Sequence, residues 1–222
     1  MKKLIVFLML VATACGASPV DQTVPDATPV LIKVHATAAA QPWQDALFTC
    51  AAPHPSVLVF SDPVSADISL RIGEPRNLTT PAFQLGWEEI LVVVNTARPL
   101  GQLNIDQVGA LFSGRIADWN EIDPGETGAV KVWVFAPGED VQQVFAQSLE
   151  GSPISSTARV ASNPEEMSQA IAADRNAVGI LSRRWQTENT SAVYVAATVP
   201  VLAVTPSEPQ GIAKDLLACL QG

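Results

Sequence analysis

The stretch Leu103–Ile122, which reads LNIDQVGALFSGRIADWNEI, describes a short capped helix followed by a sharp turn. Asn104 is a favourable N-cap residue, and Gln107 stands three positions later, as in a capping box. Gly114 stands where a helix ends in the left-handed conformation. Apolar residues recur at helical spacing along one face: Ile105, Val108, Leu111 and Phe112. Taken alone, the stretch predicts an amphipathic surface helix with a glycine stop.

Strands and helices alternate along the rest of the chain. The segment Phe83–Val94 is a long extended one, and its β-branched run Ile90–Val94 is typical of a strand buried on both faces. Further strands are expected at Val30–Val34, Ser56–Phe60, Ala66–Ile72, Val130–Phe135, Ala158–Ala161, Ala177–Leu181, Tyr194–Ala197 and Val199–Val204. Further helices are expected at Gln41–Ala51, Asp140–Leu149, Asn163–Asp174 and Gly211–Gln221. This alternation predicts an α/β fold with a largely parallel sheet.

Composition and motifs give little support for a nucleic-acid partner or for catalysis. The net charge is −9, so the chain lacks the basic surface that a nucleic-acid partner requires. The two histidines, His35 and His54, have no metal-ligand spacing around them and no serine or cysteine in a recognisable catalytic arrangement. The sequence has no Gly-x-Ser-x-Gly elbow and no P-loop. We therefore expect no metal, no cofactor and no catalytic residue.

The beginning of the chain predicts export. Residues 1–14 fit a signal peptide, because two lysines precede the apolar run Leu4–Val11, which is too short to span a bilayer. The small residues that end at Cys15 resemble the lipobox of bacterial lipoproteins, which implies a lipidated Cys15 and attachment to the cell membrane. Ordinary secretory cleavage near Ala14, with a free thiol at Cys15, is the alternative. Residues 15–29 are expected to form a flexible tether.

Two further cysteines, Cys50 and Cys219, remain if Cys15 carries the lipid. An even pair in an oxidising compartment predicts a disulfide, which would join the first helix to the last. Two buried free thiols are the alternative.

The segment Phe112–Trp119 matches the pattern F-x-G-[KR]-I-x-x-W, and it resembles the phosphate-binding-protein-like family, the type II periplasmic solute-binding proteins of ABC transporters. This resemblance implies an α/β fold with two lobes joined by two crossing segments. It also implies a binding protein outside the cytoplasm, in which a ligand enters between the lobes.

The resemblance also divides the chain. Residues 30–95 plus 190–222 would form lobe 1, and residues 96–189 would form lobe 2. The two crossings are expected near Asn95–Pro99 and Trp185–Ser191. In this arrangement both paired cysteines belong to lobe 1, as a disulfide requires.

Ligands of such folds lie beyond the carboxyl ends of strands, at helix N-termini. The loop Ala36–Gln41 resembles the small, hydroxyl-rich loop of the family, which implies that Thr37 and Ala38 contact an oxyanion. A plain strand-to-helix turn is the alternative. The segment Ala66–Ile68 resembles the A-D-I of the family, in which Asp67 would orient a neighbouring loop; alternatively, Asp67 caps the end of a strand.

The loop Ala136–Val141 stands where the phosphate binders carry G-S-G-T, so Gly138, Glu139 and Asp140 are expected ligand-binding positions. The loop contains no serine or threonine, and its two carboxylates would repel an oxyanion. At about 4 Å and intermediate dielectric this repulsion costs a few kcal/mol, whereas a helix N-terminus contributes about 0.3–1 kcal/mol. We therefore expect phosphate to bind weakly here.

Arginines supply the expected cationic clamp for an anion. Arg183 is the preferred one, because the resemblance places it after the strand Ala177–Leu181, near the cleft. A solvated surface arginine is the alternative reading. The other candidates are Arg71, Arg98, Arg115 and Arg184.

Together these observations predict a monomeric extracytoplasmic solute-binding lipoprotein. It would capture a small molecule, or an oxyanion such as phosphate, in an inter-lobe cleft and present it to an ABC permease. A binding module that has lost its transport ligand and acts as a sensory or protein-interaction lipoprotein is the alternative. A hydrolase or transferase has little support in the sequence.

Overall fold

The computed structural model describes residues 28–222, so the expected signal peptide, Cys15 and most of the tether lie outside the described residues. The strands are β1 (Val30–Ala36), β2 (Ser56–Phe60), β3 (Ile68–Ile72), β4 (Ala82–Asn95), β5 (Lys131–Phe135), β6 (Arg159–Ala161), β7 (Ala177–Ser182) and β8 (Thr190–Val204). The α-helices are α1 (Gln44–Ala51), α2 (Ile105–Ser113), α3 (Asp140–Ser148), α4 (Pro164–Ala173) and α5 (Gly211–Leu220). Short 3₁₀ helices lie at η1 (Ala38–Trp43), η2 (Trp119–Glu121) and η3 (Arg183–Trp185).

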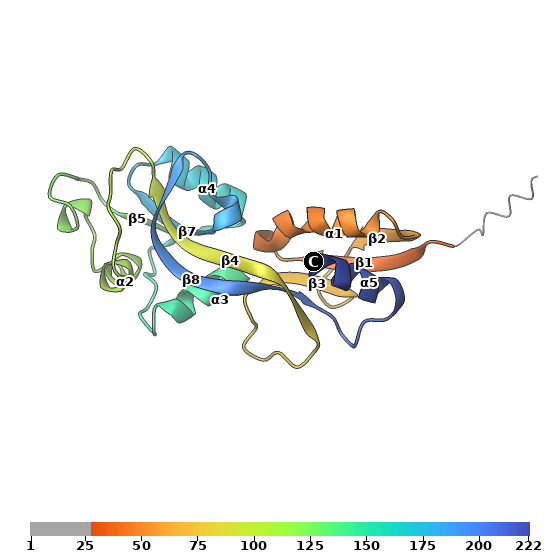
Figure 1. Ribbon diagram of the computed structural model, residues 1–222. Helices are drawn as coiled ribbons and strands as arrows, with labels where there is room; N and C mark the ends of the chain where they lie inside the picture. Colours follow the sequence, from red (N-terminus) through yellow and green to blue (C-terminus); the bar gives the residue numbers. More distant parts are fainter. Residues whose placement is uncertain (1–27) are drawn as a thin grey trace, which may run out of the picture.

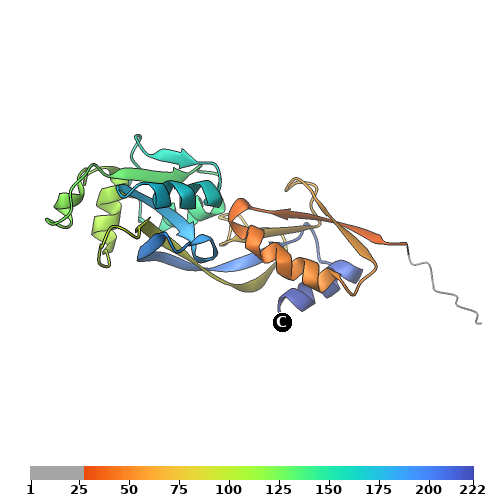
Figure 2. The same ribbon diagram turned by 90° about the horizontal axis from the view of Figure 1, so that it is seen from above.

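The strands form one mixed sheet in the order β2-β1-β3-β8-β4-β7-β5-β6. β1 pairs in parallel with β2 and β3, and β5 pairs in parallel with β6 and β7. The order β2-β1-β3 on one side of the central strands β8 and β4 is thus repeated in reverse as β7-β5-β6 on the other side. We call β1–β3 with α1 and α5 the first half, and β5–β7 with α2–α4 the second half. Figures 1 and 2 show an elongated molecule in which β4 and β8 connect the two halves.

The passage between the halves lies within β4 and β8, which pair with each other in antiparallel fashion. β3 of the first half pairs with Val201–Val204 of β8, whereas β7 of the second half pairs with Ile90–Val94 of β4. The expected crossings near 95–99 and 185–191 lie at the far end of the second half, where β4 ends and β8 begins. The division into lobes at these residues stays a prediction.

Two elements differ from the sequence-based expectation. The first helix begins as the 3₁₀ segment η1, and regular α-helix starts only at Gln44, because Pro42 cannot donate a backbone hydrogen bond within the first turns. The two extended pieces expected at 194–197 and 199–204 are one strand, β8. Pro200 lies inside this strand just where β3 ends, and its carbonyl accepts a hydrogen bond from the Gly73 backbone N–H.

The stretch that contains α2 positions the second half. Asn104 and Gln107 form the expected capping box, and Gly114 ends the helix with φ of 78°. The buried Phe112 ring packs against Phe145 of α3, with ring centroids 4.5 Å apart. The run Ile90–Val94 is fully buried, as the continuous β-branched pattern predicts. Because α3 is held by this core, its N-terminus faces the first half in a fixed position.

A disulfide joins the two helices of the first half. Cys50 of α1 and Cys219 of α5 have Cα atoms 5.8 Å apart and are separated by 169 positions in the sequence. A cross-link over so long a loop restricts the unfolded chain strongly.

We expect the double replacement Cys50→Ser/Cys219→Ser to lower the free energy of unfolding by about 2–5 kcal/mol, because the unfolded chain regains the freedom that the cross-link removes. Urea unfolding with and without a reductant measures this. The reductant should destabilise the parent and leave the double variant unchanged. Equal stability of the parent and the double variant would contradict the prediction.

Candidate functional site

The two halves meet where the loop after β1 contacts the N-terminus of α3. Asp140, the first residue of α3, is 2% exposed. Its Oδ2 accepts a hydrogen bond from Thr37 Oγ1 over 2.6 Å and another from the Ile72 backbone N–H over 2.7 Å. Its Oδ1 accepts from the Val141 N–H over 2.8 Å. We call these four residues the Asp140 junction.

The junction satisfies a buried charge. A carboxylate that leaves water needs hydrogen-bond donors, and Asp140 receives them from both halves of the molecule. Its place in the first turn of α3 also suits the positive end of the helix dipole. A nearby contact adds to the connection, since Trp185 Nε1 of η3 donates to the Ala39 carbonyl over 3.1 Å. Asp140 therefore holds α3 against the ends of β1 and β3.

Glu139 precedes α3 as its N-cap residue but makes no side-chain capping bond. Its pKa is raised above the ordinary value of 4.5, first by burial and second by the negative charge of Asp140. Gly138 lies exposed in the same loop, and its carbonyl accepts a hydrogen bond from Gln143 Nε2 over 2.9 Å. The two acidic residues of this loop thus play different parts, because Asp140 is fully hydrogen-bonded whereas Glu139 bears an unfavourable charge.

Four of the residues expected to bind ligand lie at the junction or directly beside it: Thr37 and Asp140 belong to it, and Ala38 and Glu139 are their neighbours in the chain. The small cavity lined by Ala38, Glu139 and Asp140 has no volume into which a water molecule fits. The Asp140 carboxylate accepts the Thr37 hydroxyl, the group that was expected to donate to an oxyanion. The residues are in place, but the space between them is filled by the chain itself.

Two of the expected ligand-binding residues lie elsewhere. Asp67 stands just before β3, where its Oδ2 accepts the Lys33 backbone N–H over 2.8 Å, so it ties the strand ends together. Arg183 forms an ion pair with Glu89 at a separate surface hollow that Trp87 also lines. Neither residue lines the small cavity at the junction.

Arg98, another candidate for the clamp, belongs to the core. It is 2% exposed, pairs with Glu126 over 2.9 Å, and its guanidinium lies 4.4 Å from the ring centroid of Trp119. These contacts attach the loop after β4 to the second half and leave Arg98 a structural role.

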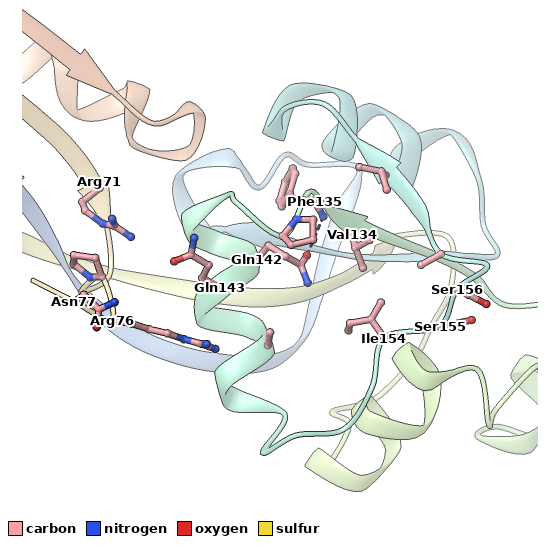
Figure 3. Close-up of a pocket in the computed structure, with 15 residues that line it drawn as sticks. Arg71, Arg76, Asn77, Val134, Phe135, Gln142, Gln143, Ile154, Ser155 and Ser156 are labelled. Carbon is pink, nitrogen blue, oxygen red and sulfur yellow. Dashed lines mark hydrogen bonds between the residues drawn. The ribbon is translucent and has the colours of Figure 1, made fainter. Parts of the chain in front are cut away.

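An open groove lies beside the junction, along the flank of α3, with a volume of about 890 Å³. The first half contributes Arg71 from the end of β3 and the loop 75–77. The second half contributes Phe135, Gln142 and Gln143, together with the segment that leads into β6. Figure 3 shows the Arg71 and Arg76 side chains extending toward α3, with Ile154, Ser155 and Ser156 beyond it. The groove is therefore an inter-half space that is large enough for a ligand.

The polar side chains of the groove differ in how many hydrogen bonds they already form within the protein. Gln142 is buried, and its Oε1 accepts the Phe135 backbone N–H over 2.9 Å. Arg71 Nε donates to the Gly73 carbonyl over 3.0 Å. Burial lowers the Arg71 pKa, and the negative charge of Asp140 partly offsets this. Arg76 is exposed. Arg76 is not among the site residues expected from the sequence, although its position shortly after the carboxyl end of a strand is a signal that could have indicated it.

Within residues 28–222, no group of three or more histidine, cysteine, aspartate or glutamate side chains is arranged to hold a metal ion. None of the helices in the described part of the chain has the length and apolarity to cross a membrane.

We expect Asp140→Asn to lower the free energy of unfolding by about 1–3 kcal/mol, because Thr37 and Ile72 lose a charged acceptor in a buried place. Urea unfolding measures the change. The control is Asp106→Asn, which removes an exposed aspartate from the first turn of α2 and so affects only the helix dipole. Equal losses in the two variants would show that the junction contacts contribute nothing.

We expect Glu139→Gln to stabilise the protein at pH 7, because the parent carries an ionised Glu139 whose pKa is raised by folding. As the pH falls toward 4, Glu139 takes up a proton in the folded state and the advantage of the variant disappears. Thermal unfolding between pH 4 and 7 follows this. Glu165→Gln, at an exposed position in the first turn of α4, is the control. A gain that is independent of pH would contradict the prediction.

Comparison with solved structures identifies the fold. A putative phosphate ABC transporter substrate-binding protein from Clostridium perfringens, solved with bound phosphate, is 13% identical with a TM-score of 0.77, over 86% of this chain and 92% of that one. An ABC-type phosphate transport receptor from Vibrio cholerae is 17% identical with a TM-score of 0.67, over 86% and 93%. The regulatory domain of CcmR from Synechocystis, in complex with 2-PG, is 10% identical with a TM-score of 0.62, over 86% and 95%.

The fold is thus shared by transport receptors and by regulatory domains. No curated protein matches the sequence. The family model described as PBP superfamily domain matches residues 20–215. The two-lobed, type II periplasmic-binding-protein-like fold and the phosphate-binding-protein-like resemblance of Phe112–Trp119 are thereby confirmed, and the chain belongs to the PBP superfamily.

Proposed function

We propose that this protein is an extracytoplasmic solute-binding lipoprotein that captures a small ligand between its two halves and presents it to an ABC permease. Cys15 would carry the lipid, and residues 15–29 would tether the binding domain to the cell membrane. Membership of the PBP superfamily supports the solute-binding part of this proposal.

The observation that carries the proposal is the groove of about 890 Å³ that residues of both halves line. Its volume lies within the range of sites for small organic ligands, about 300–1,000 Å³. A ligand in it would contact Arg71 of the first half and Gln143 of the second half. Since β4 and β8 connect the halves, a ligand that contacts both would stabilise one relative orientation of them, which is a signal that a permease can recognise.

A second candidate function rests on the Asp140 junction. Asp140 already ties the halves together through Thr37 and Ile72, without any ligand. A module held in this way would serve as a sensory or protein-interaction lipoprotein, with its surface rather than a bound solute as the signal. The regulatory domains among the solved structures with this fold are consistent with such a role.

Thermal unfolding of the domain in the presence of individual solutes distinguishes the two candidates. The set includes phosphate, sulfate, molybdate, small and medium-sized organic acids, and neutral compounds of similar size. A solute that binds in the groove should raise the melting temperature by about 5–10 °C at a concentration near 100 times its Kd. Ala146→Phe should abolish the rise, because Ala146 lines the groove and a phenyl ring there would occupy it.

The control for this variant is Ala170→Phe on α4, which does not line the groove. The proposal requires a solute whose stabilisation survives Ala170→Phe and is lost in Ala146→Phe. Failure of every solute to stabilise the parent would overturn it and favour the interaction module.

A further inference from the structure

The charge of the groove differs from that of the rest of the molecule. The chain carries a net charge of −9, with 22 acidic residues. Among the described residues that line the groove, two are arginines, Arg71 and Arg76, and none is acidic. In so acidic a protein this local positive charge opposes the general repulsion of anions and favours an anionic ligand.

The two arginines have free hydrogen-bonding capacity. Within residues 28–222, the ion pairs of the structure involve other cations, and the Arg71 contact to Gly73 uses only its Nε. The terminal nitrogens of a guanidinium form a planar fork that fits a carboxylate or a phosphate ester. Both arginines come from the first half, and Figure 3 shows them extending toward α3.

The rest of the groove is largely apolar. Its wall in the second half includes Val134, Phe135, Ile154 and Val160. Removing an apolar ligand surface from water against such side chains contributes about 25 cal/mol per Å². A tetrahedral inorganic anion has no surface of this kind, and it would leave most of the groove empty. The volume and the apolar wall therefore fit a ligand with an organic body.

The filled Asp140 junction supports the same conclusion independently. A small oxyanion between Thr37 and the start of α3 would have to displace a carboxylate that accepts two hydrogen bonds from the first half. A small oxyanion is therefore disfavoured at the N-terminus of α3.

We propose that the ligand is an organic anion, with a carboxylate or phosphate-ester head held by Arg71 and Arg76 and an apolar body packed against the second half near Phe135 and Ile154. The inference rests on the proposed solute-binding function and specifies its ligand class. Because the anionic head of the ligand contacts the first half and its apolar body contacts the second, a ligand of this class connects the two halves.

Isothermal titration calorimetry tests the proposal with three sets of probes: straight-chain and phenyl-substituted carboxylates of six to twelve carbons, the matching phosphate monoesters, and the corresponding neutral amides and alcohols. Inorganic phosphate is the fourth probe. We expect members of the first two sets to bind, and the neutral analogues and inorganic phosphate to bind at least about tenfold more weakly.

Variants then locate the head group. Arg76→Glu changes an exposed residue, so the fold should survive, and it should weaken binding of the anions by about tenfold or more. Arg71→Gln tests the second arginine. Arg115→Gln, at an exposed arginine that does not line the groove, is the matched control and should leave the affinity unchanged.

The outcomes separate this inference from the proposed function. If a neutral solute or inorganic phosphate binds and the organic anions do not, the ligand class is wrong while solute binding stands. Anion binding that Arg76→Glu and Arg71→Gln leave unchanged would overturn the assigned site. Absence of binding for every probe and every solute of the thermal screen would overturn both proposals.

Discussion

The arrangement of the molecule depends on one buried carboxylate. Asp140 lies at the start of α3 in the second half, and both hydrogen bonds to its Oδ2 come from the first half. A charge in this position is tolerable only while those donors are present, so the relative placement of the halves and the hydrogen bonding of Asp140 depend on each other. The hydrophobic core also holds α3 in place, because α2 packs on α3 through Phe112 and Phe145.

The same carboxylate occupies a position at which this fold could otherwise bind an anion. A helix N-terminus that faces a cleft is suited to bind an anion. Here the chain supplies that anion itself, and Glu139 adds a further negative charge beside it. A groove lined by Arg71 and Arg76 lies along the flank of α3, and in our proposal these two arginines take the place of backbone amides as the positive groups. We therefore propose that the protein retains the two-lobed binding architecture but differs in the position and the chemical class of its ligand.

Local sequence signals predicted much of the fold. The capping box of Asn104 and Gln107 and the buried run Ile90–Val94 each depend on neighbouring residues alone, so both were predictable. The two pieces expected at 194–197 and 199–204 are one strand, because pairing with β4 continues through Thr198, and this long-range pairing is visible only in the folded chain.

The candidate site was predicted less well. The family resemblance implied that the loops of Thr37 and Asp140 both lie at the ligand site, and the sequence indicated that the acidic loop disfavours phosphate. It could not show that Asp140 turns inward and accepts the Thr37 hydroxyl, since the partners are 103 positions apart. For the same reason Arg183 was preferred over Arg71: only the folded chain shows that Arg183 pairs with Glu89 at another surface.

A crystal structure determined in the presence of excess tungstate, a tetrahedral oxyanion with strong anomalous scattering, would test directly whether Asp140 occupies the anion position at the N-terminus of α3. We expect that the hydrogen bonds of Asp140 to Thr37 and Ile72 are retained and that no anomalous peak lies between Thr37 and the start of α3. A tungstate ion bound there, with the Asp140 carboxylate displaced, would contradict this expectation.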